Sequence, residues 1–150
     1  MAITITGYNH TAAKLMTLDL DAEAANFYLM LVDGTTAFDA THTTLDTATD
    51  SFDDAISGTT WTATGENLTN VTVSTVNTNS AKFDADDLSV TAGATTISAE
   101  AAILYINEGG ADTTYTPLWY IDFGETRAST EGNPFAVNWD ANGIATIAVI

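Results

Sequence analysis

The sequence has no cysteine and no long apolar run. Without cysteine among its 150 residues, the chain has no disulfide bond, no thiolate metal site and no cysteine nucleophile. No stretch approaches the roughly 18 apolar residues that a membrane span needs. The segment Met1 to Thr6 lacks both the basic and the apolar part of a secretion signal. We therefore expect a chain made in the cytoplasm, with no membrane partner.

Basic residues are almost absent. Lys14, Lys82 and Arg127 are the only lysines and arginines, against 20 acidic residues, and the formal net charge is −17. Such a chain has no basic patch that could neutralise phosphates, so we expect no nucleic-acid partner. Its acidic surface favours solubility by self-repulsion. Binding to another acidic body then requires apolar contacts that outweigh this repulsion.

The remaining composition is that of a folded domain. Hydrophobic residues make up 45% of the chain and aromatic residues 9%, which is too much apolar material for a disordered protein. A chain of 150 residues has the common size of one domain. We predict a single domain over residues 1–150, with residues 1–8 as an N-terminal arm or an edge strand.

Hydrophobic periodicity predicts strands along most of the chain. Ile3 to Thr6 alternates β-branched residues, and Asn26 to Val32 is a short apolar run that ends at the turn dipeptide Asp33-Gly34. The expected strands are 3–6, 26–32, 68–76, 82–84, 88–90, 95–98, 101–106, 117–123, 135–139 and 144–150. Short strands at this spacing predict an all-β fold, an antiparallel β-sandwich or a jelly-roll-like domain.

Some segments are less regular. His10 to Leu20 shows no convincing helical stripe, so we expect it to be weakly β. Residues 35–58 predict a long surface excursion, in which 44–56 allows one short helix. The run 117–123 is expected to end at Gly124, next to the strand 101–106 in the core. Asn142-Gly143 between alternating apolar residues predicts a hairpin that joins the last two strands.

Catalytic patterns are missing from the sequence. His10 and His42 are the only histidines, and neither has a serine or aspartate placed so that an acid–base arrangement can be read. The chain has no glycine-rich phosphate loop and no G-x-S-x-G nucleophile motif. The three tryptophans lie in strand-like segments and are expected mostly in the core: Trp61, Trp119 and Trp139. We predict a protein that is not an enzyme and has no cofactor.

Acidic residues gather in three places, which raises the question of calcium. Carboxylates close in sequence are the ligands that Ca²⁺ uses, yet none of these groups has the EF-hand spacing. Solvated acidic surface and turn-forming aspartates explain them more simply, and no metal site is predicted. The first place to look for calcium is Asp84, Asp86 and Asp87; the other groups are Asp19, Asp21 and Glu23, and Asp50, Asp53 and Asp54.

Several segments resemble a family of small phage virion proteins. The most characteristic is Asn138 to Ile144, with the sequence Asn-Trp-Asp-Ala-Asn-Gly-Ile, inside the matching segment Phe135 to Ile147. The order of the segments carries the resemblance, which covers roughly residues 26–150. The further segments are Phe38 to Leu45, Ala81 to Asp87 and Leu118 to Gly124.

This resemblance implies an all-β structural component of a bacteriophage virion. Such a protein is synthesised in the host cytoplasm and then located on the capsid surface. The first expectation is a decoration or cement protein that binds the outer face of the major capsid protein lattice and stabilises the head, as a trimer or as isolated protomers. Capsid contacts are expected from Ile3, Thr4, Ile5 and Thr6 through strand addition.

Two alternatives stay open beside the capsid role. One is a receptor- or carbohydrate-binding module of a head or tail fibre, in which exposed aromatic side chains stack on sugars. The other is a head–tail connector or another tail component, which the same strand pattern could serve.

Overall fold

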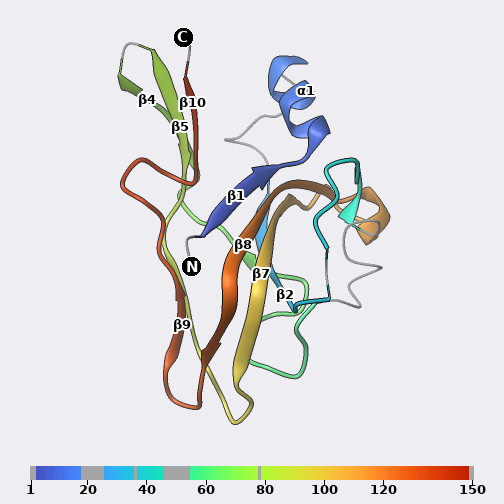
Figure 1. Ribbon diagram of the computed structural model, residues 1–150, viewed down its shortest axis with the longest axis vertical. Coiled ribbons are helices and arrows are strands. Elements are labelled where there is room, and N and C mark those ends of the chain that lie inside the picture. The colour runs from blue at the N-terminus through green and yellow to red at the C-terminus, as the bar shows by residue number, and fades with distance from the viewer. Residues whose placement is uncertain (1–2, 18–25, 36, 46–54, 78, 149–150) are drawn as a thin grey trace.

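The computed structural model describes residues 3–17, 26–35, 37–45, 55–77 and 79–148. The fold is mostly β, with antiparallel sheets packed on one another in a sandwich-like arrangement and one short α-helix (Figure 1). This confirms the predicted fold class. No helix in the described ranges is long and apolar enough to cross a membrane.

The largest sheet has five strands in the order β1-β8-β7-β2-β3. All of its neighbouring strands pair antiparallel. The predicted runs 101–106 and 117–123 do lie side by side, because β7 and β8 form the centre of this sheet. The strands are β1 (Thr4–Gly7), β2 (Phe27–Val32), β3 (Glu66–Asn67), β7 (Ile97–Ile106) and β8 (Thr116–Ser129).

The five-stranded sheet is buried on both faces, which explains the unbroken apolar run of β2. Successive side chains of a strand point to opposite faces. Leu29 and Leu31 lie in one buried cluster, whereas Met30 and Val32 lie in a second cluster on the other face. All four side chains are fully buried. A strand that is buried on both faces therefore has apolar residues at successive positions, without alternating polar ones.

Two smaller sheets contribute side chains to the cluster on the first face. One has the order β10-β5-β4, and the other pairs β6 with β9. Phe83 from β5 and Phe135 from β9 pack into the first cluster, where they meet Trp119 and Phe123 of β8. In Figure 1, β4, β5 and β10 extend away from the main sheet. The strands are β4 (Thr72–Asn77), β5 (Ser80–Asp84), β6 (Leu88–Thr91), β9 (Pro134–Val137) and β10 (Ala145–Ala148).

Irregular segments cover the second face. Tyr8 and Leu45 are buried there, and the ring of Phe38 contacts the rings of both Tyr8 and Tyr120. Ala55 forms an isolated bridge with Val32. A 3-10 turn, η1 (Asp112–Thr114), precedes β8. Of the helix predicted within 44–56, residues 46–54 lie outside the described residues.

One prediction is wrong: the segment after β1 is helical, not weakly β. The helix α1 (Asn9–Thr17) contains Ala12, Ala13 and Lys14, which have high helix propensity. A polar contact of its first turn attaches it to the sheet. There Thr11 is buried, and its Oγ1 donates a hydrogen bond of 2.9 Å to the carbonyl oxygen of Leu118.

The predicted hairpin at Asn142-Gly143 is also wrong, although the turn itself is present. The Gly143 N–H donates to the carbonyl oxygen of Asp140 at 2.7 Å, and Gly143 has a φ of +87°. The strands on either side belong to different sheets, however. β9 pairs with β6 and β10 pairs with β5, so the turn passes the chain from one sheet to another.

β7 and β8 are longer than the sequence pattern predicts. Residues 95–98 and 101–106 were expected as two strands, but 97–106 form one continuous strand. β8 does not end at Gly124; it continues to Ser129 through an irregularity in which residues 123–126 lie opposite Glu100 alone. A bulge lets a strand bend without ending, and Gly124 adopts a φ of +71° there.

Candidate functional site

The four residues predicted as capsid contacts lie at the edge of the main sheet. Ile3 precedes β1, and Thr4, Ile5 and Thr6 are in it, paired in register with Asp122, Ile121 and Tyr120 of β8. All four are exposed; the exposed fractions of Ile3 and Ile5 are 57% and 40%. Among the described strands, β1 has β8 as its only partner, so its outer edge is free. Such an edge is a template for strand addition.

The chain around β1 is firmly attached to the sheet. The Tyr8 N–H donates to the carbonyl oxygen of Leu118 at 3.1 Å, and the Tyr8 side chain is only 2% exposed. The Asn9 N–H donates to the carbonyl oxygen of Ala40 at 2.9 Å. Residues 4–7 therefore form an edge strand that is attached to the sheet at its C-terminal end.

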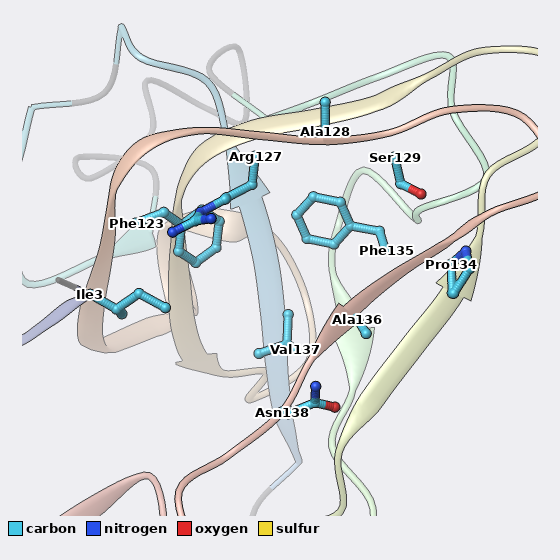
Figure 2. A pocket seen from close by; sticks show the side chains of 10 residues that line it. All are labelled: Ile3, Phe123, Arg127, Ala128, Ser129, Pro134, Phe135, Ala136, Val137 and Asn138. Carbon is cyan, nitrogen blue, oxygen red and sulfur yellow. The ribbon is translucent and has the colours of Figure 1, made fainter. Parts of the chain in front are cut away.

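An open groove of about 400 Å³ begins beside Ile3. Figure 2 shows that it runs between the second half of β8 and the length of β9. Sequence reasoning missed this groove, because β8 was expected to stop at Gly124 and β9 to be half of a hairpin. Its lining residues are Ile3, Phe123, Arg127, Ala128, Ser129, Pro134, Phe135, Ala136, Val137 and Asn138.

The groove is nearly uncharged. Arg127 is the only charged residue of its lining, and its guanidinium forms a 3.1 Å ion pair with Glu125 on the same strand. Outside the lining, Glu131 lies in the exposed turn between β8 and β9. The Asp122 carboxylate lies near Tyr120, on the face of the sheet opposite to that of Phe123. The groove thus has a neutral interior in a strongly acidic protein.

The calcium candidates do not form a common site. The Asp84 carboxylate forms a 2.6 Å ion pair with the Lys82 ammonium group, and the Asp86 carboxylate accepts hydrogen bonds from Thr69 and Asn70. Asp87 accepts the backbone N–H of Trp139 at 2.8 Å. No group of three or more metal-ligating side chains occurs in the described part of the chain. The other two acidic groups, at residues 19–23 and 50–54, lie outside it.

Each aspartate of the first group has a structural use. Asp86 holds Asn70, which has a φ of +51° and whose Nδ2 lies 2.6 Å from the carboxylate. Its backbone carbonyl also accepts the indole N–H of Trp139 at 3.1 Å. The aspartates therefore join the loop before β4 and the segment after β9 to the β5–β6 connection.

Each of the two histidines lies close to a specific polar group of the fold. His10 Nε2 is 2.6 Å from the carbonyl oxygen of Pro117, so it helps to attach α1 to β8. His42 lies 3.9 Å from the carboxylate of Asp39. The Asp39 carboxylate accepts hydrogen bonds from both the hydroxyl and the N–H of Thr41, which lower its pKa below the ordinary value. Both contacts suit structural roles.

Aromatic side chains are used in the cores. Trp61 and Trp119 are buried, as predicted, and Trp139 is half-buried against the first cluster. Every tryptophan, tyrosine and phenylalanine of the described residues is buried or half-buried. Burial raises the pKa values of Tyr8, Tyr105 and Tyr120, and for Tyr105 the hydroxyl also donates to the carbonyl oxygen of Thr64.

Comparison with protein-family models, curated proteins and solved structures finds no match. The functional argument therefore depends on the β1 edge, the groove and the distribution of charge.

Proposed function

We propose that this protein is a structural component of a bacteriophage virion, a decoration protein that attaches to the capsid shell through the edge strand β1. The observation that carries the proposal is the exposed, uncharged edge of β1, to which no second strand of the described residues is paired, flanked by the exposed side chains of Ile3 and Ile5. Residues 26–150 resemble small phage virion proteins, and this resemblance is the reason for proposing the capsid as the assembly to which the edge attaches.

The chain has little protection against pairing at β1. Edge strands of soluble proteins usually carry lysine, proline or a bulge that prevents another strand from adding. The four residues Thr4, Ile5, Thr6 and Gly7 contain none of these, and their register on β8 is regular. An edge left open in this way is suited to main-chain pairing with a strand of another protein.

Charge supports attachment at this edge over other parts of the surface. Residues 1–13 contain no acidic, lysine or arginine side chain, whereas the chain as a whole carries −17. A partner that approaches β1 therefore avoids much of the repulsion that it would meet elsewhere if it were itself acidic. Ile3 and Ile5 add apolar contacts that salt does not screen.

The arrangement of aromatic side chains favours this proposal over a sugar-binding module. Sugar recognition by stacking needs an exposed aromatic face. In the described ranges, all aromatic rings are buried or half-buried, and those of Phe123 and Phe135 pack on each other at 6.5 Å between centroids. The exposed apolar side chains of the structure are aliphatic.

The test is attachment to capsids with β1 altered. Ile3 and Ile5 would both be replaced by lysine, which leaves the core intact because both side chains are exposed. The matched control is the replacement of Val73 and Val76 by lysine; these residues are exposed to 50% and 42% on β4, and the change in net charge is the same. Both variants and the parent chain are added to capsids that lack this chain, and occupancy is measured by sedimentation and cryo-electron microscopy.

We expect the Ile3→Lys/Ile5→Lys variant to lose occupancy at least tenfold and the β4 control to attach like the parent. Equal attachment of both variants would refute a role for β1. Density for the chain only at a tail or fibre would refute the capsid position in favour of the alternatives, and absence from the particle would refute the virion role itself.

A further inference from the structure

We propose that the groove between β8 and β9 binds an extended segment of a partner polypeptide, with an apolar centre and basic residues at its ends. The segment would add as a strand to the free edge of β9. The groove shares Ile3 with the β1 edge, but the strand edge that it offers belongs to β9, and the proposal does not depend on attachment to a capsid.

The backbone of β9 has an unused edge that faces the groove. β9 pairs with β6 through residues 134–137, and in the described part of the chain no strand pairs with its other side. The opposite wall is also open: β1 covers β8 only as far as Asp122, and residues 127–129 pair with β7 alone among the described strands. The groove therefore separates two strand edges of the same molecule.

Of these two edges, β9 is the regular one. The β8 wall contains the irregularity at residues 123–126 and the left-handed Gly124, which disturb a hydrogen-bonding ladder. β9 has an unbroken register on β6. Pro134 opens β9 and has no N–H, so the donors available to a partner are the alternate N–H groups among residues 135–138 that point away from β6. About four residues of an added strand fit this length, at ~3.3 Å per residue.

The lining provides an apolar floor for alternate side chains of such a segment. Phe123 of β8 and Phe135 of β9 are buried between the walls, and Val137 is half-buried beside them (Figure 2). Ala128 and Ala136 are exposed and small, which leaves the room that a partner side chain would occupy. Added strands gain affinity from main-chain pairing and specificity from such alternate contacts.

Charge determines the kind of partner. The only cation of the groove, Arg127, is already paired with Glu125, so a charged side chain inside the groove would find no free counterion. Outside it, Glu131 lies in the turn that joins β8 to β9, and the chain as a whole carries −17. Lysine or arginine at the ends of the segment would be attracted by this acidic surface. The same argument disfavours a second copy of this chain, which would bring a further −17.

The experiment uses the full chain and the synthetic peptide Lys-Thr-Val-Thr-Val-Thr-Val-Lys. Backbone amide NMR locates binding, and titration calorimetry measures affinity. We expect shifts at residues 135–138, slower hydrogen exchange of their edge amides and a stoichiometry of one. A peptide with glutamate at both ends should bind at least tenfold more weakly at low salt, because the protein carries a net charge of −17. A peptide with proline in place of the central threonine should not bind, because proline cannot complete the ladder.

A pair of protein variants tests the position. Ala136→Lys places a long charged side chain in the groove, and the control Ala111→Lys makes the same change of charge at an exposed loop residue before η1. We expect at least tenfold weaker binding for the first and unchanged binding for the second, with both thermal transitions retained. Absence of binding by the lysine peptide, shifts outside the groove, equal binding of the glutamate peptide, or self-association of the chain through β9 would each overturn the proposal.

Discussion

Gly143 lies directly against the backbone of Phe83. The carbonyl oxygen of Phe83 accepts the N–H of Ile144 at 2.8 Å, and a Cβ placed on Gly143 would be only 2.6 Å from the same oxygen. Gly143 also has a φ of +87°, a conformation that side-chain-bearing residues rarely adopt. Glycine at this position lets the chain leave β9 and join β10 to β5.

Replacing Gly143 by alanine is therefore expected to destabilise the fold strongly. Strain from the positive φ costs about 1–2 kcal/mol, and the contact with a backbone oxygen should raise the loss to about 3 kcal/mol. Urea denaturation measures the free energy of unfolding. The control is Gly132→Ala, at a φ of +79° with no atom within 4 Å of the added Cβ, where only the strain applies. Equal losses in the two variants would show that the contact with Phe83 does not matter.

The same turn shows what local sequence could and could not predict. Asp140 and Asn142 form the expected turn: the Asp140 carboxylate accepts hydrogen bonds from the N–H and the side-chain amide of Asn142, which lower its pKa. Turn chemistry is local and was predicted correctly. The partners of β9 and β10 are instead chosen by residues far away in the chain, such as Leu88 and Phe83, and no local pattern encodes that choice.

Strand existence and burial were predictable because they depend on periodicity. The runs around Leu29 and Leu104 are apolar on both faces because the sheet is covered on both sides. The edge strand from Thr4 was predictable for the same reason. The groove was not, since it requires the bulge near Gly124 and the separation of β8 from β9 into different sheets. Both are tertiary features.

The hydrogen bond from Thr11 to Leu118 gives a second test of the fold. Thr11→Val preserves the shape of the side chain but removes the hydroxyl that donates to a buried carbonyl oxygen. We expect a loss of about 1 kcal/mol in the free energy of unfolding, the net value of a typical buried hydrogen bond. Thr6→Val, at an exposed position of β1, should change stability by less than about 0.5 kcal/mol. A neutral result for Thr11→Val would mean that α1 is held by its other contacts.

The buried tyrosines predict how the fold responds to alkali. Folding raises the pKa values of Tyr8, Tyr105 and Tyr120 above the ordinary value of about 10, mainly by burial. The contribution of these groups to stability is therefore fully present below about pH 10 and is lost as the pH rises through the folded pKa values.

Phenolate absorbance and circular dichroism, followed together during an alkaline titration, test this expectation. The part of the phenolate signal that develops at the highest pH should appear together with loss of the β-sheet circular dichroism spectrum. The reason is that these phenols ionise readily only when they are exposed to water. Tyr105→Phe removes the hydroxyl that donates to Thr64 and should reduce the late phenolate amplitude. Complete phenolate formation in a chain that keeps its β spectrum would contradict the burial of these residues.

Salt should stabilise this protein, and calcium should stabilise it no more than another divalent cation does. A net charge of −17 repels itself more strongly in the folded chain than in the expanded unfolded chain. Raising NaCl from about 20 mM to about 500 mM shortens the Debye length severalfold and should raise the melting temperature.

The carboxylates of Asp84, Asp86 and Asp87 are engaged in separate contacts with Lys82, Asn70 and Trp139. Calcium and magnesium chloride at equal ionic strength should therefore give equal increases, measured by calorimetry. A larger increase with calcium that Asp86→Asn abolishes would instead reveal a site that these carboxylates assemble around the ion.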